Sequence, residues 1–444
     1  MNLKPSGDRG TFIDLAPLRH SPAFARLWLG GAISGIGSQV TVVAVGLRIF
    51  DLTHSTLSVS LVALFALGPM VILGLYGGSL ADSHDRRRVA LVTAIAAWSS
   101  IIGIATLTWF DVRQTLPLYL LTTVNAVASI IIGSTRQAIT PRLLPAQLLP
   151  AASALNGMAN GVMVTLGPAL AGVLAATVGI EWTFTLDAVL FTAAFMGILT
   201  LPAIVPERQS VETGVRAMLS GIRFLRHVPH VGMTFVLDMI AMAFGQPRVL
   251  FPAIGALLIG GGPVTVGILS AAGALGTLGS SLFSGRLGTV RYQGRAVERA
   301  IILYGVMVLG FGLVLFVVSL TRAPSPHAPL NVVALLVASV FLALSGAADN
   351  ISSIFRMTIL QTSTPDHMQG RLQGLFTVVV TSGPRLGDLY VGALSALGAL
   401  WFPPLLGGLI IIALVAWISG RYRSLRTYDA HERSGTLSTN EQTA

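Results

Sequence analysis

Long apolar runs, separated by short polar or Pro/Gly segments, occupy most of the chain. A helix needs about 20 mostly apolar residues to cross the hydrocarbon core of a bilayer. A transmembrane β-strand would instead alternate apolar and polar residues over about 10 positions, and stretches such as Ile101 to Phe110 show no such alternation. The pattern therefore predicts an all-α membrane protein with about twelve transmembrane helices, near residues 25–50, 57–80, 89–110, 117–138, 150–176, 183–203, 231–257, 264–287, 297–320, 330–354, 374–398 and 403–420.

The composition agrees with this pattern. Hydrophobic residues make up 53% of the chain and charged residues 10%, whereas soluble domains carry roughly 25% charged residues. The first apolar run is too long for the core of a signal peptide and no small-residue cleavage site follows it, so we expect it to be the first span. Because the chain has no cysteine, disulfides and thiolate chemistry are excluded.

The placement of the basic residues predicts the orientation. If the N-terminus is cytoplasmic, all but five of the 28 basic residues fall on the cytoplasmic side. The exceptions are Arg113 and Arg322 in outer loops, and Arg48, Arg248 and Arg385 within spans. This positive-inside bias predicts a multi-pass protein of the cell inner membrane with both termini in the cytosol. The net charge of +10 thus reflects topology and does not indicate a nucleic-acid partner.

The spans form two groups of six, which predicts two pseudo-symmetric six-helix bundles. Residues 204–230 between the groups carry apolar residues at helical spacing with arginines interleaved, a pattern typical of an amphipathic helix on the membrane surface. We expect this helix to tether the bundles, with a regulatory role as the alternative. The predicted segments are an N-terminal segment at 1–22, bundles at 23–203 and 231–420, the linker at 204–230, and a disordered polar tail at 421–444.

Matching features recur in the two halves about 207 to 220 residues apart, as expected for repeats in a transporter. Arg136 stands nine residues before Pro145, and Arg356 stands nine residues before Pro365. Likewise, the pair Gly167-Pro168 in the fifth span is echoed by Gly383-Pro384 in the eleventh. Two related bundles with a substrate site between them near the bilayer midplane are a known transporter plan.

A charged turn, "GGSLADSHDRRRV", joins the second and third spans on the cytoplasmic side. A small residue at Gly78 permits close helix approach, Asp82 can face the positive end of a helix dipole, and the arginines hold the turn in the cytosol. Gly78, Asp82, Arg86, Arg87 and Arg88 resemble the signature of the major facilitator superfamily, although Ser83 replaces the usual base and Asp85 the usual glycine. The resemblance implies a gate latch in which Asp82 meets the eleventh span near Gly370 and Arg371; a simple topology signal is the alternative.

The fifth span contains "GVMVTLGPALAG", which resembles the pattern of exporters in this superfamily at Gly167, Pro168 and Gly172. Proline bends a membrane helix and small residues permit close packing, so plain packing is the alternative. Over residues 17 to 420 the chain is similar to the enterobactin exporter group of siderophore effluxers, through "LTHST", "RVLFPA" and "LQTSTPDHMQGRLQGL". Macrolide and other drug effluxers share much of this pattern, so the resemblance implies an exporter without fixing its substrate.

Three arginines lie within predicted spans, where a charge costs at least about 2.5 to 3.5 kcal/mol at the bilayer centre. Arg48, Arg248 and Arg385 could bind an anionic or catechol-bearing substrate by charge-assisted hydrogen bonds. The alternative for two of them is local pairing, of Arg48 with Asp51 and of Arg385 with Asp388 at i,i+3. No acid lies within a turn of Arg248, which favours a functional role for that residue.

Four acids also lie within spans: Asp187, Asp238, Asp349 and Asp388. A carboxyl that meets water in one state and is shielded in the next can take up and release a proton, which would couple outward substrate movement to proton entry. Asp349, in "GAADNISS", is the first candidate because its small neighbours leave it room to face a cavity. Structural ion pairs are the alternative for each acid.

Other function classes find little support in the sequence. No Walker-type phosphate loop exists, and Lys4 is the only lysine, so the chain is not itself a nucleotide-driven pump. The motifs H-E-x-x-H and G-x-S-x-G are both absent, so a membrane-embedded lipid enzyme is a remote alternative. We therefore expect a cofactor-free, metal-free, monomeric secondary exporter whose partners are a small molecule, protons and the bilayer. Multidrug efflux and uptake by the same fold are the nearer alternatives.

Overall fold

The computed structural model describes residues 14–83, 85–201, 222–282, 290–321, 325, 329–364, 366–397 and 399–421. The first half comprises α1 (Ala16–His20), α2 (Pro22–Thr53), α3 (Thr56–Ser83), α4 (Arg86–Trp109), α5 (Leu116–Leu143), η1 (Ala146–Leu148), α6 (Leu149–Thr177) and α7 (Ile180–Leu199). The second half comprises α9 (Pro229–Phe244), η2 (Arg248–Leu250), α10 (Phe251–Ala253), η3 (Ile254–Leu258), α11 (Gly262–Leu282), α12 (Gln293–Thr321), α13 (Val332–Ser363), α14 (Asp366–Ser395) and α15 (Phe402–Arg421).

The predicted set of about twelve spans is confirmed for the described part of the chain, where α9, η2, α10 and η3 together make one interrupted span. Ten of the spans are long and apolar enough to cross a membrane by length and composition. The other two are α3, whose described apolar part is Thr56–Met70, and α14. The helix α14 is more polar because it carries Arg385 and Asp388 within its length.

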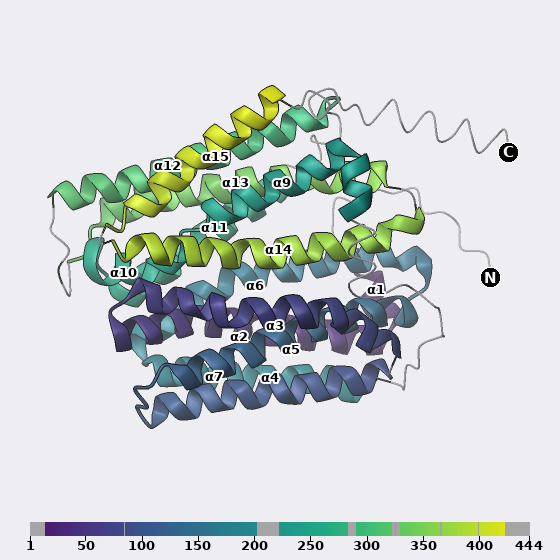
Figure 1. Cartoon of the computed structure of the whole chain (residues 1–444). Helices are drawn as coiled ribbons and strands as arrows, with labels where there is room; N and C mark the ends of the chain where they lie inside the picture. The colour runs from purple at the N-terminus through teal and green to yellow at the C-terminus, as the bar shows by residue number, and fades with distance from the viewer. Residues whose placement is uncertain are drawn as a thin grey trace.

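The helices run roughly side by side, and α1 and the last turn of α15 lie at the same end of the molecule (Figure 1). We call this end the terminal face, and the end at which α2 stops and α15 starts the opposite face. Several helices begin where the sequence supplies a cap. The Ser21 and Asn331 hydroxyl and amide oxygens accept hydrogen bonds from the Phe24 and Ala334 amides, at 3.2 and 3.1 Å, which satisfies free N–H groups of the first turn.

The seventh span is predicted as one run over 231–257, and the structure interrupts it. The α-helix α9 stops at Phe244, and a single 3-10 turn, η2, follows Gly245-Gln246-Pro247. The span then ends in a π-helical turn, η3, and turns into α11 through Gly260, Gly261 and Gly262, all with positive φ. Glycine adopts this backbone region without steric cost, which explains the run of three.

Helix packing divides the molecule into two bundles. In the first, α2 packs on α6 and α7, and α4 and α5 complete the layer with α3 and α7. In the second, α12 packs on α13 and α15, α11 on α13, and α14 on α9. The contacts between bundles are made by α3 with α14 and by α6 with α11. The second helix of each half thus meets the fifth helix of the other, so the two contacts are related by the pseudo-symmetry of the halves.

The hydrophobic core shows which face is closed. One large buried cluster crosses between the bundles at the opposite face; it includes Ile49 and Phe184 from the first and Leu250 and Phe311 from the second. Toward the terminal face the buried clusters of the described residues stay within a single bundle. The structure is therefore sealed at the opposite face.

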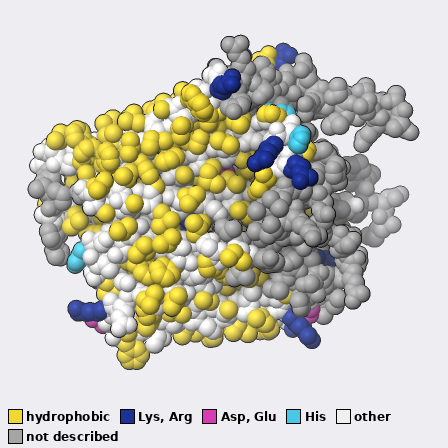
Figure 2. Space-filling view, viewed as in Figure 1, with side chains coloured by type: hydrophobic (Ala, Val, Ile, Leu, Met, Phe, Trp, Pro, Cys, Tyr) yellow, Lys and Arg dark blue, Asp and Glu magenta, His cyan; other side chains and the backbone are white. Residues whose placement is uncertain are grey.

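The outer surface fits a lipid environment. Large apolar side chains such as Val92, Met196, Val333 and Trp417 are exposed, and Figure 2 shows hydrophobic side chains over the middle of the molecule with the visible arginines near its ends. The predicted domain boundaries stay predictions, because most of the linker 204–230 and nearly all of the tail 421–444 lie outside the described residues.

Candidate functional site

The seal at the opposite face rests on two close contacts between the bundles. Between α3 and α14, the Ser395 hydroxyl donates to Thr56 Oγ1 at 2.8 Å, and Gly392 leaves room for the Ser60 side chain. Between α6 and α11, a Cβ on Gly172 would lie 2.7 Å from the Gly267 Cα. Small residues on both sides permit this approach.

The predicted exporter motif supports the same contact. Pro168 lies inside α6, and its carbonyl oxygen would be 3.0 Å from a Cβ on Gly267. Gly167 faces the other way and packs against Gln39 of α2. The small residues of the motif therefore let α6 pack closely against α2 of its own bundle and α11 of the other bundle.

We expect Gly267→Leu to hold the bundles apart at the opposite face and to abolish transport, because overpacking this contact leaves no position for the added side chain. Closure is measured at the other contact between the bundles, where α3 meets α14. Because the chain lacks cysteine, a disulfide between Thr56→Cys and Ser395→Cys forms only when these two helices are in contact. Gly279→Leu on the same helix is the control, since a Cβ there meets nothing within 4 Å. Unchanged cross-linking in Gly267→Leu would contradict the prediction.

Two of the predicted arginines share one carboxylate in the second bundle. Arg248 of η2 forms a bidentate pair with Asp388 of α14, from Nε to Oδ1 at 2.9 Å and from Nη2 to Oδ2 at 2.8 Å. Arg385 Nη1 lies 3.9 Å from Asp388 Oδ2, which confirms the predicted i,i+3 pair. Asp388 is buried, whereas the Arg248 side chain is 42% exposed. This positive cluster has two cations for one acid. It lies in the half of the bundle nearer the opposite face.

A second cluster, nearer the terminal face, has the reverse balance. Arg356 of α13 forms an ion pair with Asp238 of α9, with Nη1 2.5 Å from Oδ1, and its Nη2 lies 3.6 Å from Asp349 Oδ1. Arg356 and Asp238 are buried, whereas Asp349 is 28% exposed. This negative cluster thus has two acids for one cation, beside a small recess lined by Thr234, Phe235, Arg356, Leu360 and Phe376.

Tyr304 of α12 contacts the seventh span at its break, which lies between Asp238 and Arg248 along the chain. Its hydroxyl donates to the Gly245 carbonyl at 2.7 Å, so it satisfies a backbone group at the break of the seventh span. This hydrogen bond therefore holds the break between α9 and η2, and broken helices line the binding site in known transporters.

Asp187 lies apart from both clusters, in the core of the first bundle. It comes from α7 and is fully buried; the Thr41 hydroxyl donates to its Oδ2 at 2.5 Å, and its Oδ1 has no hydrogen-bond partner. No cation is paired with it among the described residues. Its candidacy for proton coupling stays a prediction.

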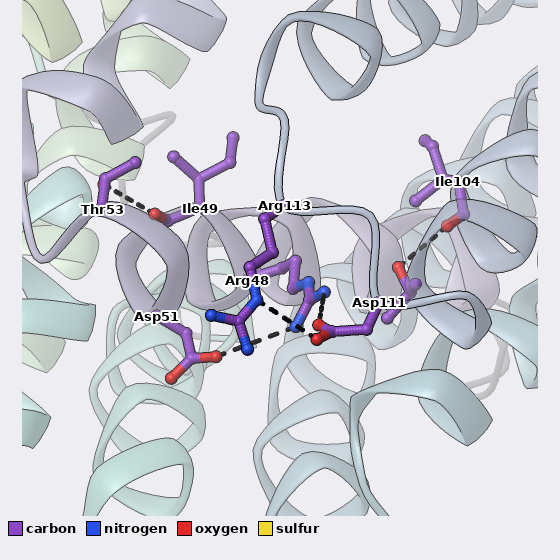
Figure 3. Close-up of polar contacts among 8 residues, drawn as sticks. Arg48, Ile49, Asp51, Thr53, Ile104, Asp111 and Arg113 are labelled. Atoms are coloured by element: carbon purple, nitrogen blue, oxygen red, sulfur yellow. Dashed lines mark hydrogen bonds and ion pairs between the residues drawn. The ribbon is translucent and has the colours of Figure 1, made fainter.

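Arg48 lies at the end of α2 at the opposite face and reaches a partner that the sequence did not indicate (Figure 3). Its Nη2 donates to Asp111 Oδ1 at 2.8 Å, while the predicted partner Asp51 is 3.8 Å away. Asp111 follows α4 in a left-handed conformation, with φ of 46°. Hydrogen bonds from Arg48 and then Arg113 lower the pKa of the Asp111 carboxyl. Arg48 thus ties α2 to the turn between α4 and α5.

We expect Asp111→Asn to lower the melting temperature in detergent more than Asp51→Asn, because it removes the closest counter-charge of the buried Arg48 guanidinium. The pKa of Asp111 is lowered in the folded protein from 3.8, so its contribution is present above pH 3.8 and is lost as the pH falls through the lower folded value. Equal melting temperatures for the two variants would contradict this role.

The charged turn between α3 and α4 is described in part. Asp85 caps α4 by accepting from the Arg87 amide at 3.0 Å, which accounts for an acid where the signature has glycine. Arg86 donates to the Ala138 carbonyl of α5 at 2.8 Å, and Arg87 to the Leu199 carbonyl of α7 at 2.9 Å. Arg88 lies 3.9 Å from Asp85. The arginines thereby join the start of one helix to the ends of two others. The predicted latch of Asp82, beside Gly78, with Gly370 and Arg371 involves side chains outside the described set.

Comparison with known proteins identifies the family. A model described as transmembrane secretion effector matches residues 13–443. The chain belongs to this family. Among curated relatives, the enterobactin exporter EntS of Citrobacter koseri is 29% identical over 385 residues, covering 87% of this chain and 88% of the relative. The same exporter of Shigella boydii is 30% identical over the same shares.

Solved structures show that this secretion effector has the major facilitator fold. The nucleoside transporter NupG, in its D323A mutant, covers 91% of this chain and 99% of its own with a TM-score of 0.66 at 15% identity. The POT family transporter PepTSo covers 92% and 99% with a TM-score of 0.70 at 12% identity. A bacterial homologue of the iron transporter ferroportin covers 90% and 98% with a TM-score of 0.62 at 15% identity. The family and its relatives make the chain a multi-pass membrane transporter of the exporter type.

Proposed function

We propose that this exporter moves a siderophore or another amphipathic small molecule out of the cytosol in exchange for protons, by alternating access. The observation that carries the proposal is the separation of charge in the second bundle. The positive cluster (Arg248, Arg385 and Asp388) suits the anionic group of a substrate, and the negative cluster (Asp238, Asp349 and Arg356) suits a proton. The names of the curated relatives support the siderophore.

The positive-inside bias supports a cytosolic terminal face. We propose that the protein works as a monomer in the inner membrane. The seal at the opposite face then leaves the substrate path to be loaded from the cytosolic side. Protonation of the negative cluster and substrate binding to the positive cluster act on the same interrupted span, through Asp238 of α9 and Arg248 of η2. Because both clusters include a residue of the interrupted seventh span, protonation of one cluster can prevent substrate binding at the other.

Proteoliposomes with a pH gradient test the proposal. A panel of siderophores and hydrophobic antibiotics is added, and uptake is followed together with internal pH by a trapped dye. We expect one class of compound to accumulate while protons leave, and a protonophore to stop accumulation. Selection of antibiotics alone would favour multidrug efflux. Transport that ignores the pH gradient would overturn the proton antiport.

A cellular measurement tests the direction. Deletion of the gene should make cells retain a siderophore or become sensitive to a drug. Unchanged secretion together with unchanged drug tolerance would count against export, and impaired uptake would identify the import alternative.

A further inference from the structure

The internal repeat places two arginines at equivalent points of the two bundles. Arg136 lies on α5, the fourth span of the first half, and Arg356 on α13, the fourth span of the second. Each stands seven residues before the last residue of its helix, Leu143 or Ser363. Both guanidiniums therefore lie at the same depth, in the part of the membrane nearer the terminal face.

The neighbouring helices differ at the matching point. The first span of each half begins with proline, at Pro22 of α2 and Pro229 of α9. Nine residues on, α9 carries Asp238, which pairs with Arg356, and α2 carries Gly31. A Cβ on Gly31 would lie 2.6 Å from Arg136 Nη1, so the guanidinium lies over the glycine where the other half has its carboxylate.

Arg136 has no counter-charge among the described residues. Its Nε has no hydrogen-bond partner, and no acid within that part of the chain forms an ion pair with it. Arginine stays charged in proteins, and an unpaired charge in the membrane is costly. The side chain is half-buried, so it is shielded without being closed off from a ligand.

We infer that Arg136 is an anion-binding subsite, on the first bundle, for a carboxylate or catecholate oxygen of the substrate. This inference rests on the proposed export function and names the chemical class of its cargo. The subsite lies nearer the terminal face than the positive cluster on the second bundle. An anionic group loaded from the terminal face therefore meets Arg136 first and the surplus charge of Arg248 and Arg385 later, which gives the transport path a direction.

The repeat itself supplies the test. Gly31→Asp copies the second half by placing a carboxylate beside Arg136, and Gly31→Asn adds nearly the same volume without the charge. The fold can accept either, since the added Cβ meets only the far end of the flexible Arg136 side chain. The probes are 2,3-dihydroxybenzoate and its neutral amide, 2,3-dihydroxybenzamide, with affinities measured on the full chain in nanodiscs by scintillation proximity.

We expect the wild type and Gly31→Asn to bind the anion about tenfold or more tightly than the amide, as one charge-assisted hydrogen bond provides. Gly31→Asp should lose this preference, and Arg136→Gln should lose it as well; if Arg136→Gln does not fold, the two Gly31 variants still decide. Equal affinities in the wild type, or a preference retained in Gly31→Asp, would overturn the subsite.

Failure of the subsite and failure of the exporter are separable. If pH-driven transport of a neutral amphipathic compound persists in every variant but the wild type shows no preference for the anion, the subsite is wrong and the exporter stands. If the anion preference follows the predicted order and the wild type moves nothing across a membrane, the subsite stands and the proposed transport is wrong.

Discussion

Asp349→Asn should abolish pH-driven transport and leave the fold intact. Asp349 and Asp238 share a single guanidinium, and Asp349 is the more distant and the more exposed of the two acids. It can exchange a proton with water while Asp238 keeps Arg356 neutralised. Asparagine has the same shape and cannot take up a proton, so the cluster would lose its variable charge.

The measurement compares two kinds of transport in the same proteoliposomes. Substrate accumulation driven by a pH gradient should disappear, whereas exchange of labelled for unlabelled substrate without a gradient should continue. Asp51→Asn is the control, because Asp51 is a 74% exposed acid at the opposite face and should retain both activities. Near-normal accumulation in Asp349→Asn would remove this residue from the proton path, and Asp187, buried beside Thr41, would become the next candidate.

The sequence predicted the spans well because each must present an apolar surface to lipid along its length. It did not show that the seventh span is interrupted. The run across Gly245-Gln246-Pro247 is apolar on both sides, and what stabilises the break is the Tyr304 hydroxyl from another helix. An interruption that depends on a tertiary hydrogen bond leaves only weak traces in a hydropathy pattern.

The charged residues show the same limit. Spacing correctly indicated the contacts of Arg48 with Asp51 and of Arg385 with Asp388, yet these are the longer contacts, at 3.8 and 3.9 Å. The 2.8 Å contacts of Arg48 with Asp111 and of Arg248 with Asp388 join residues 63 and 140 positions apart. In a membrane a charge pairs with whichever helix packs against it, so its partner depends on the fold.

The repeat carried information that spacing alone did not. The repeat aligns Arg136 with Arg356, and among the described residues a carboxylate lies beside Arg356 alone of these two. The sequence indicates Asp238 as a candidate for proton coupling by its position in a span, whereas it indicates Arg356 only as a marker of the repeat. Departures between two halves of a repeat are therefore as informative as their agreement.

Asp238→Asn should destabilise the protein more than the other substitutions of acids considered above. Asp238 and Arg356 have side chains that are 1% and 3% exposed, and breaking one partner of a buried ion pair costs about 3 to 5 kcal/mol. Asp349 is 3.6 Å from the same guanidinium and offers a second counter-charge, so we expect a value near the lower end, about 3 kcal/mol.

The same substitution has a functional consequence that distinguishes it from Asp349→Asn. With Asp238 gone, Asp349 becomes the only counter-charge for Arg356 in the negative cluster, so it should stay ionised and pH-driven transport should fall even in the protein that remains folded. The double variant Asp238→Asn with Arg356→Gln removes both charges and should recover much of the lost stability, because neutral groups are cheaper to bury than an unpaired cation. Unfolding by SDS titration measures the stability of the wild type, the two single variants and the double variant, which together form a double-mutant cycle. If the double variant is as unstable as the sum of the two single variants, the ion pair is not what holds α9 against α13.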